Sequence, residues 1–157
     1  MTGTDIIEAL INEHHDIDTE IEEFLRVLEQ GGIESAPLTR AFDELKRHIY
    51  LEEEFLFPPI RKAGLLMPIM VMIREHGELW GLMAHIESLL DGGDQDALRR
   101  ACQQLLGELN QHNSKEEPII YPHTALDLTD EETAALADRI AQGTLPSGWV
   151  CEAATTR

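Results

Sequence analysis

The sequence contains few cysteines and few basic residues, and each shortage excludes a class of protein. Two cysteines in 157 residues, Cys102 and Cys151, make neither a disulfide framework nor a C-x-x-C motif. Twelve lysines and arginines stand against 30 aspartates and glutamates, which gives a net charge of −18. Because binding to nucleic acid needs a basic surface, we expect no nucleic-acid partner.

Long hydrophobic runs are also missing. No stretch approaches the roughly 18 uninterrupted apolar residues that indicate a membrane span. The chain opens with polar residues, where a signal peptide would have a basic and then an apolar region. We therefore expect a cytoplasmic protein without a membrane partner. A chain of 157 residues is most simply one domain with its own core.

Apolar residues recur at steps of three and four positions, which is the pattern of amphipathic helices. Four such segments cover residues 6–28, 37–64, 68–90 and 94–122. Short turns marked by glycine and proline join these segments. We therefore predict an all-α fold, an antiparallel up-down-up-down four-helix bundle.

The predicted bundle occupies residues 1–123, and residues 124–157 form a C-terminal segment. In that segment, Thr129 and Glu132 have the spacing of a capping box that opens a short fifth helix, ending near Ala141. The tail that follows contains Leu145 and Trp149, which are available to pack on the bundle.

Two phrases occur twice in the same order. The phrase E-H-x-x-[IL] is found at residues 13–17 and 75–79, and H-x-x-x-E-E-x-x-x-[FY]-P is found at residues 48–58 and 112–122. The chain therefore reads as two copies of one unit. The copies place six candidate metal ligands on predicted helices: His14, His48, Glu52, His76, His112 and Glu116.

Helix geometry explains why these residues can act together. Residues four apart rise about 6 Å and lie on nearly the same face, so His48 and Glu52 can approach one ion together. His112 and Glu116 have the same spacing. At about 100° per residue, His14 and His76 fall within the apolar stripes of their helices. Their neighbours His15 and His85 point elsewhere and are expected to face water.

Buried carboxylates need a cation, because burying one alone costs several kcal/mol. Four imidazoles and two carboxylates are too many ligands for one ion, so two metals with two bridging carboxylates is the natural count. This mixed donor set favours iron, with manganese or zinc as possible substitutes. The competing hypothesis is a metal-free bundle, since a single H-x-x-x-E is usually a surface pair and a lone core histidine is usually hydrogen-bonded.

Residues near the motifs receive other interpretations. We interpret Trp80 as a wall of the metal pocket. Three carboxylates are expected to be solvated or to orient a ligand: Glu53, Glu54 and Glu117. Three further aromatic residues are interpreted as ordinary core or rim residues: Tyr50, Phe57 and Tyr121.

Over about residues 5–123, the chain resembles the hemerythrin HHE cation-binding family, whose signature is similar to the two repeated phrases. The resemblance implies a four-helix bundle that holds a non-heme di-iron centre. It also implies that Glu52 and Glu116 bridge the irons and that the four histidines are terminal ligands.

One position departs from the oxygen-carrying members, which have a second histidine one turn after the histidine on helix three. Trp80 stands there in this chain. The sequence is more similar to the carboxylate-bridged members implicated in nitric-oxide handling, in repair of damaged iron centres, or in iron or oxygen sensing. Three functions stay open: binding of O2 or NO, their reduction by electrons from an external donor, and an iron-storage or sensing module. The sequence predicts no particular oligomeric state.

Overall fold

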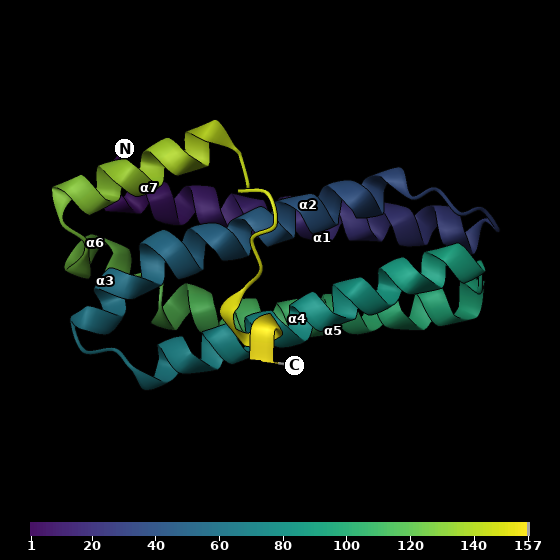
Figure 1. The fold of residues 1–157 in the computed structure, drawn as a ribbon. Helices are drawn as coiled ribbons and strands as arrows, with labels where there is room; N and C mark the ends of the chain where they lie inside the picture. The colour runs from purple at the N-terminus through teal and green to yellow at the C-terminus, as the bar shows by residue number, and fades with distance from the viewer. Residues whose placement is uncertain (157) are drawn as a thin grey trace.

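Helices make up most of the chain. The structure is a computed structural model that describes residues 1–156; Arg157, the last residue of the predicted segment 124–157, lies outside the described residues. The prediction of an all-α fold is confirmed, because none of the described residues lies in a strand. The elements are α1 (Gly3–Glu29), α2 (Ala36–Leu51), the π-helix η1 (Glu52–Leu56), α3 (Phe57–Lys62), α4 (Met67–Gly92), α5 (Gln95–Ile119), α6 (His123–Asp127), α7 (Asp130–Gln142) and the 3₁₀ helix η2 (Glu152–Thr156) (Figure 1).

Local interactions at the helix ends determine where the long helices begin and end. At the start of α1, the Thr2 hydroxyl accepts a hydrogen bond from the Asp5 N–H (3.2 Å), and the Asp5 carboxylate accepts one from the Thr2 N–H (2.7 Å). This reciprocal pair is a capping box. The Asp94 carboxylate accepts from the Ala97 N–H (3.1 Å) at the start of α5. The preceding helix, α4, ends at Gly92 and is capped by Gly93, whose φ of 67° favours glycine.

The four long helices enclose two separate clusters of buried apolar side chains. Helix α1 packs along α2, α4 packs along α5, and α1 also contacts α5 (Figure 1). One cluster contains Phe24 and Ile86, and the other contains Ile6 and Ile69. The clusters occupy different levels along each helix. On α1, for example, His14 lies between Leu10 of one cluster and Ile17 of the other. Among the described residues, no helix has the length and apolar character to cross a bilayer.

The predicted fifth helix is present as α7. The Thr129 hydroxyl accepts from the Glu132 N–H (3.1 Å), and the Glu132 carboxylate accepts from the Thr129 N–H (2.9 Å), as the capping-box spacing predicts. Helix α7 packs against α1, α2 and η1. It therefore covers the end of the long helices where the apolar cluster of Ile6 and Ile69 lies.

The tail after α7 crosses the long helices and ends on α4, as the yellow part of Figure 1 shows. The Trp149 ring lies edge-on to Tyr50 and Trp80, with centroids 5.2 and 5.7 Å away. Further along, Ala153 lies so close to Gly77 of α4 that a side-chain Cβ at Gly77 would stand 2.5 Å from the Ala153 Cβ. The tail is therefore packed on α4 next to His76.

Candidate metal centre

The six candidate ligands come together between the two apolar clusters. All six are buried, with 0% exposure for Glu52 and Glu116 and at most 4% for the histidines. Their side chains form two groups in which the candidate ligand atoms all lie within 4.8 Å of one another. The first group is His14, His48, Glu52 and Glu116, and the second group is Glu52, His76, His112 and Glu116. Both carboxylates therefore belong to both groups.

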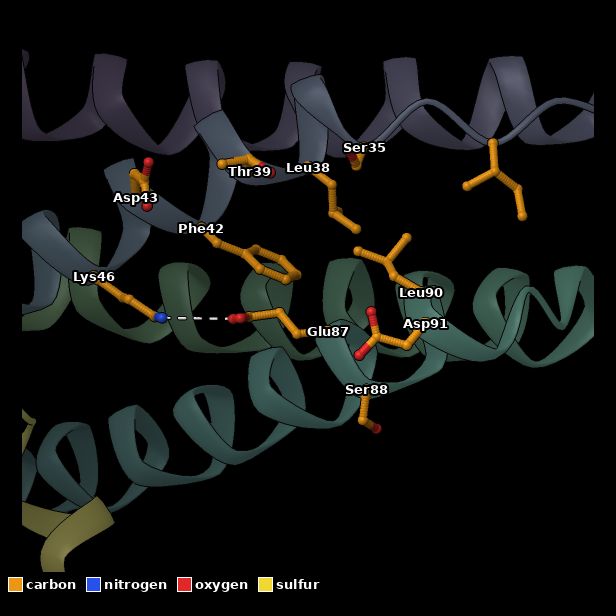
Figure 2. A pocket seen from close by; sticks show the side chains of 11 residues that line it. Ser35, Leu38, Thr39, Phe42, Asp43, Lys46, Glu87, Ser88, Leu90 and Asp91 are labelled. Atoms are coloured by element: carbon orange, nitrogen blue, oxygen red, sulfur yellow. Dashed lines mark ion pairs between the residues drawn. The ribbon is translucent and has the colours of Figure 1, made fainter.

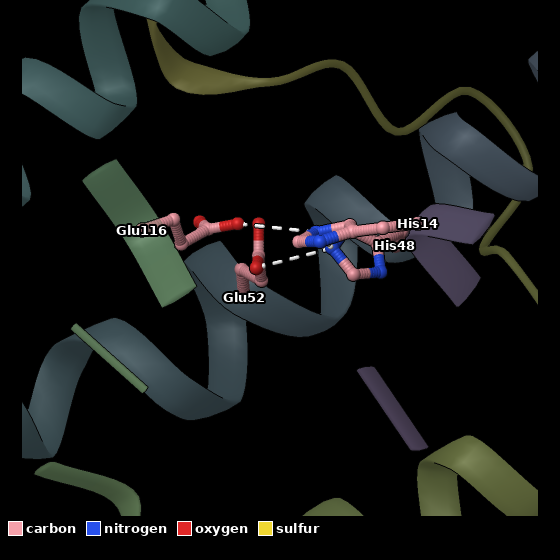
Figure 3. Close-up of side chains that lie close together, drawn as sticks. All are labelled: His14, His48, Glu52 and Glu116. Atoms are coloured by element: carbon pink, nitrogen blue, oxygen red, sulfur yellow. Dashed lines mark hydrogen bonds and ion pairs between the residues drawn. The ribbon is translucent and has the colours of Figure 1, made fainter. Parts of the chain in front are cut away.

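Each shared carboxylate reaches one histidine in each group. Glu52 Oε2 lies 3.1 Å from His48 Nε2, and Glu52 Oε1 lies 3.1 Å from His76 Nε2. Glu116 Oε1 lies 3.3 Å from His14 Nε2, and its Oε2 lies 3.5 Å from the corresponding nitrogen of His112. Figure 3 shows the first group, with the two carboxylates facing the two imidazoles. Two oxygens on each glutamate thus serve two separate positions.

Polar atoms without a hydrogen bond mark the second group. Within the described residues, Glu52 Oε1, Glu116 Oε2 and His76 Nε2 are buried and lack a hydrogen-bond partner. Buried polar atoms are nearly always paired, and an unpaired charged one is costly. A cation between these atoms would be bound by all three. Since imidazole and carboxylate ligands suit iron, manganese or zinc, the residues fit a metal ion.

A further carboxylate binds the outward nitrogen, Nδ1, of each histidine. We call these four residues the outer carboxylates: Glu13 on His48 (2.7 Å), Glu53 on His76 (2.7 Å), Glu75 on His112 (2.9 Å) and Glu117 on His14 (2.8 Å). When Nδ1–H donates outward, the Nε2 lone pair points into the site, as metal ligation requires.

The outer carboxylates follow a closed order around the helices. Helix α1 orients the histidine of α2, η1 orients that of α4, α4 orients that of α5, and α5 orients that of α1. The sequence leaves two alternatives for Glu53 and Glu117, a solvated carboxylate or one that orients a ligand. The structure shows the orienting contact for both. No role is predicted from the sequence for Glu13 or Glu75, although each directly precedes a candidate ligand in the repeated E-H phrase. Glu54 accepts a hydrogen bond from the Trp149 indole (3.0 Å).

Opposite charges in the site outweigh the effect of burial on the pKa of His48 and on that of His112. Burial lowers the pKa of His48, but the carboxylates of Glu52 and Glu13 raise that pKa well above its ordinary value. Burial also lowers the pKa of His112, yet the Glu116 carboxylate and other acidic neighbours raise it to about 10. The raised pKa of each imidazole favours its protonated form in the metal-free protein. A metal ion that binds these nitrogens would displace protons from them.

Tyr121 is part of the site, which corrects its interpretation as an ordinary core or rim residue. Its hydroxyl donates to Glu52 Oε2 (2.7 Å) and lies 3.0 Å from Glu116 Oε1. The same oxygen lies 3.0 Å from His14 Nε2 and 3.2 Å from His48 Nε2. Burial and the two carboxylates hold the pKa of Tyr121 well above its usual range, so the hydroxyl is neutral. It contacts every member of the first group.

A wide helical turn brings this aromatic position into the site in both copies. In each copy the backbone N–H of the aromatic residue donates to the backbone carbonyl of the glutamate five residues earlier. Phe57 donates to Glu52, and Tyr121 donates to Glu116 at 3.1 Å. On a regular α-helix, residues five apart point about 140° apart. The wider turn reduces that offset. The predicted helix over 37–64 thus contains a π-helical segment, η1, of a kind frequent at functional sites.

Both aromatic rings stack on a histidine of the site. Phe57 stacks on His76, with centroids 5.6 Å apart and planes at 15°. Tyr121 stacks on His14, with centroids 5.6 Å apart and planes at 21°. The two rings therefore occupy equivalent places, and only one of them carries a hydroxyl. The paired [FY]-P positions of the repeat are the sequence signal for this contrast.

Two surface hollows approach the second group. One is lined in part by Glu53 and Phe57, both of which contact His76. The other is lined in part by Glu75 and by His112 itself. A third hollow, between α2 and α4, is lined by Phe42 and other residues, with an ion pair between Lys46 and Glu87 (3.5 Å) (Figure 2). None of the six candidate ligands lines that third hollow.

The C-terminal tail reaches an outer carboxylate of the second group. The Glu152 N–H donates to Glu53 Oε1 (3.0 Å), while the other oxygen of Glu53 accepts from His76. Trp80, interpreted from sequence as a wall of the metal pocket, packs against Trp149 of the tail and has Lys46 Nζ 5.5 Å from the centre of its ring. The tail and the candidate ligand His76 are thus connected through Glu53.

A comparison with known protein families gives a match over most of the chain. The model of the hemerythrin HHE cation binding domain matches residues 4–124. All six candidate ligands, the outer carboxylates and Tyr121 lie within that range. Searches of curated proteins and of solved structures gave no significant match.

Proposed function

The chain belongs to the hemerythrin HHE cation-binding family, and on that premise we propose that it is a non-heme di-iron protein that binds or redox-processes O2 or NO. The observation that carries this proposal is the pair of buried groups that share Glu52 and Glu116. His14 and His48 would hold one iron in the first group, and His76 and His112 would hold the other iron in the second group. Both carboxylates would bridge the irons.

The donor set supports iron. Two imidazoles with carboxylates are the ligands of non-heme iron sites that keep open coordination positions. A bound iron pair would supply those positions for a diatomic ligand, together with one-electron redox chemistry. The protein's own residues hold the ligand nitrogens inward through the outer carboxylates and place apolar clusters on both sides of the polar layer. Turnover would further require an external electron donor.

The same proposal includes the arrangement of the helices. We infer an antiparallel up-down-up-down bundle over residues 1–123, with residues 124–157 as an added C-terminal segment. Consecutive long helices that pack on each other support this topology: α1 with α2, and α4 with α5. Their connections are short, and short connections favour antiparallel neighbours.

A second candidate function is an iron-sensing or storage module. The hydrogen bond from Glu152 to Glu53, which also holds His76, favours sensing. Through that contact, a change in metal loading would alter the position of the tail. Limited proteolysis of the metal-free and iron-loaded protein tests this function, because a sensor's tail is cleaved at different rates in the two states.

The main proposal is tested by anaerobic loading with Fe(II), counting of iron per chain, and exposure to air while the visible spectrum is recorded, followed by evacuation. Two irons per chain and a charge-transfer colour that evacuation removes would support reversible O2 binding. Two irons that oxidise without a reversible adduct would support redox processing or sensing.

Adjacent histidines provide a matched control. His14→Ala is expected to lower the iron count, because His14 is a buried member of the first group. His15→Ala changes the next residue, which is exposed, and is expected to keep two irons. Absence of stoichiometric iron in the unmodified protein would refute the proposed function.

A further inference from the structure

The two groups have ligands of the same kind, but a hydroxyl is present in only one of them. We propose that Tyr121 makes the two metal positions unequal: its hydroxyl competes with a metal ion for the first group, so the second group takes up the first ion. This inference rests on the proposed metal site and assigns an order to its loading. Tyr121 is thus a specificity-determining residue rather than an ordinary core aromatic.

The position of the hydroxyl oxygen carries the argument. That oxygen lies between 2.7 and 3.2 Å from one atom of each of four residues: His14, His48, Glu52 and Glu116. Those residues are the four members of the first group. Metal–ligand bonds to nitrogen and oxygen are about 2.0–2.2 Å long, so a metal ion bound by these four side chains needs the space that the hydroxyl fills. The ion must displace the hydroxyl.

The second group presents no such competitor. Phe57 occupies the equivalent place, stacked on His76, and has no hydroxyl. Three buried atoms of this group, on Glu52, His76 and Glu116, lack a hydrogen-bond partner within the part of the chain that the structure describes. A metal ion here breaks no hydrogen bond to a tyrosine, and it replaces the close contact between Glu52 Oε1 and His76 Nε2 (3.1 Å). One surface hollow is lined in part by His112 of this group, and another is lined in part by Glu53 and Phe57, which contact His76.

The expected difference between the positions follows from the hydrogen bonds that must break. Hydrogen bonds to charged groups are among the stronger ones in proteins, and losing one changes an equilibrium constant by about tenfold or more. We therefore expect two affinity classes in the unmodified protein, separated by at least about tenfold.

The test is a calorimetric titration of the metal-free protein with Zn2+, repeated with Co2+ to follow the visible spectrum of each bound ion. His76→Ala removes a ligand found only in the second group, and His14→Ala removes one found only in the first. The His76→Ala protein is expected to keep only the weak class, and the His14→Ala protein only the tight class. These variants assign each class to its group.

The repeat supplies a reciprocal pair of variants. Tyr121→Phe removes the competing hydroxyl and is expected to raise the affinity of the weak class by about tenfold, which brings the classes together. Phe57→Tyr adds a hydroxyl at the equivalent place and is expected to weaken the tight class by a similar factor. Because Phe57→Tyr retains every hydrogen bond of the first group, it tests the inference even where Tyr121→Phe folds poorly.

The outcomes separate this inference from the proposed function. Two equal classes in the unmodified protein, or a lower affinity of the weak class in Tyr121→Phe, would overturn the inference while leaving a two-metal site in place. Binding of neither Zn2+ nor Co2+ by any variant would overturn the proposed function as well. Distinct Co2+ spectra at the two positions, made more alike by Tyr121→Phe, would support the inference independently of affinity.

Discussion

The two halves of the repeat form the same inner ligands and yet have different surroundings. Each half supplies two histidines and one shared glutamate, and each histidine is held by an outer carboxylate. Around the first group, however, the hydroxyl of Tyr121, which belongs to the second half, reaches the inner atoms. Around the second group the equivalent ring is Phe57, which belongs to the first half. In the second half, the residue after His76, Gly77, lies under the tail. The corresponding residue of the first half, His15, is exposed.

A duplicated ligand set therefore does not make equivalent positions. Residues that bind no metal decide which buried atoms already have hydrogen-bond partners and which part of the chain covers them. The following experiments test how far the two halves depend on each other and where they differ.

The largest effect is expected from a shared carboxylate. If the halves were independent, Glu52→Ala would spare one metal position; because Glu52 belongs to both groups, we expect loss of both ions. The metal-free variant should also be less stable by about 3–5 kcal/mol, since breaking a buried ion pair leaves charge uncompensated. Metal counting and urea denaturation measure the two effects. For the metal count, Glu54→Ala, at an exposed neighbour, is the control, and retention of two ions by Glu52→Ala would contradict the sharing.

A histidine in each half should make the free energy of unfolding of the metal-free protein fall at alkaline pH. The pKa of His112 is raised to about 10 in the folded protein, and that of His48 is also raised well above its ordinary value. The unfolded chain loses these protons near pH 6.5, so their stabilising effect is complete below that pH and is lost as pH rises toward about 10. Each histidine contributes a slope of at most about 1.4 kcal/mol per pH unit.

Urea denaturation of the metal-free protein across this pH range measures the slope. Variants His48→Gln and His112→Gln should each flatten it, which compares the contributions of the two halves. A free energy of unfolding that does not change between pH 6.5 and pH 10 would contradict the prediction.

The outer carboxylates should have smaller effects that differ between the halves. Replacing such a residue typically costs about 10–100-fold in metal affinity. We expect Glu53→Gln to cost more than Glu117→Gln, because the Glu53 side chain is only 6% exposed and also accepts from the tail, whereas the Glu117 side chain is 33% exposed. Zn2+ titration of both variants provides the comparison. Equal losses would show that burial and the tail contact add nothing.

The smallest effect is expected from moving the tail. Gly77→Ala places a Cβ 2.5 Å from that of Ala153, so the tail must shift, at a cost of about 1–3 kcal/mol. Gly107→Ala is the matched control on α5: it has no neighbour within 4 Å, and alanine is favoured in a helix by about 0.5–1 kcal/mol. Thermal unfolding should thus shift in opposite directions for the two variants. A stabilised Gly77→Ala protein would show that the tail is not packed there.

Periodicity was sufficient to predict the helices and to select six residues that the structure brings together, because a helix face can be read from one chain segment alone. It does not reveal which neighbouring helix supplies each contact. For that reason Glu13 and Glu75 received no role, although their partners lie on adjacent helices. Tyr121 was misinterpreted because a regular α-helix turns it away from Glu116, and the bond between residues five apart alters that turn. The tail contact joins Glu53 to a residue far along the chain, where no periodic pattern applies.

The closed order of the outer carboxylates has a kinetic consequence. Helices α1, α4 and α5 each carry a candidate ligand and orient one on another helix, and η1, which continues α2, orients His76. One helix therefore cannot swing outward without loosening side chains on two helices. Departure of a bound ion therefore requires a concerted opening of the helices rather than the rotation of one side chain. Ion exchange should be slow and steeply dependent on temperature, and a bound ion should slow amide hydrogen exchange in all four long helices together.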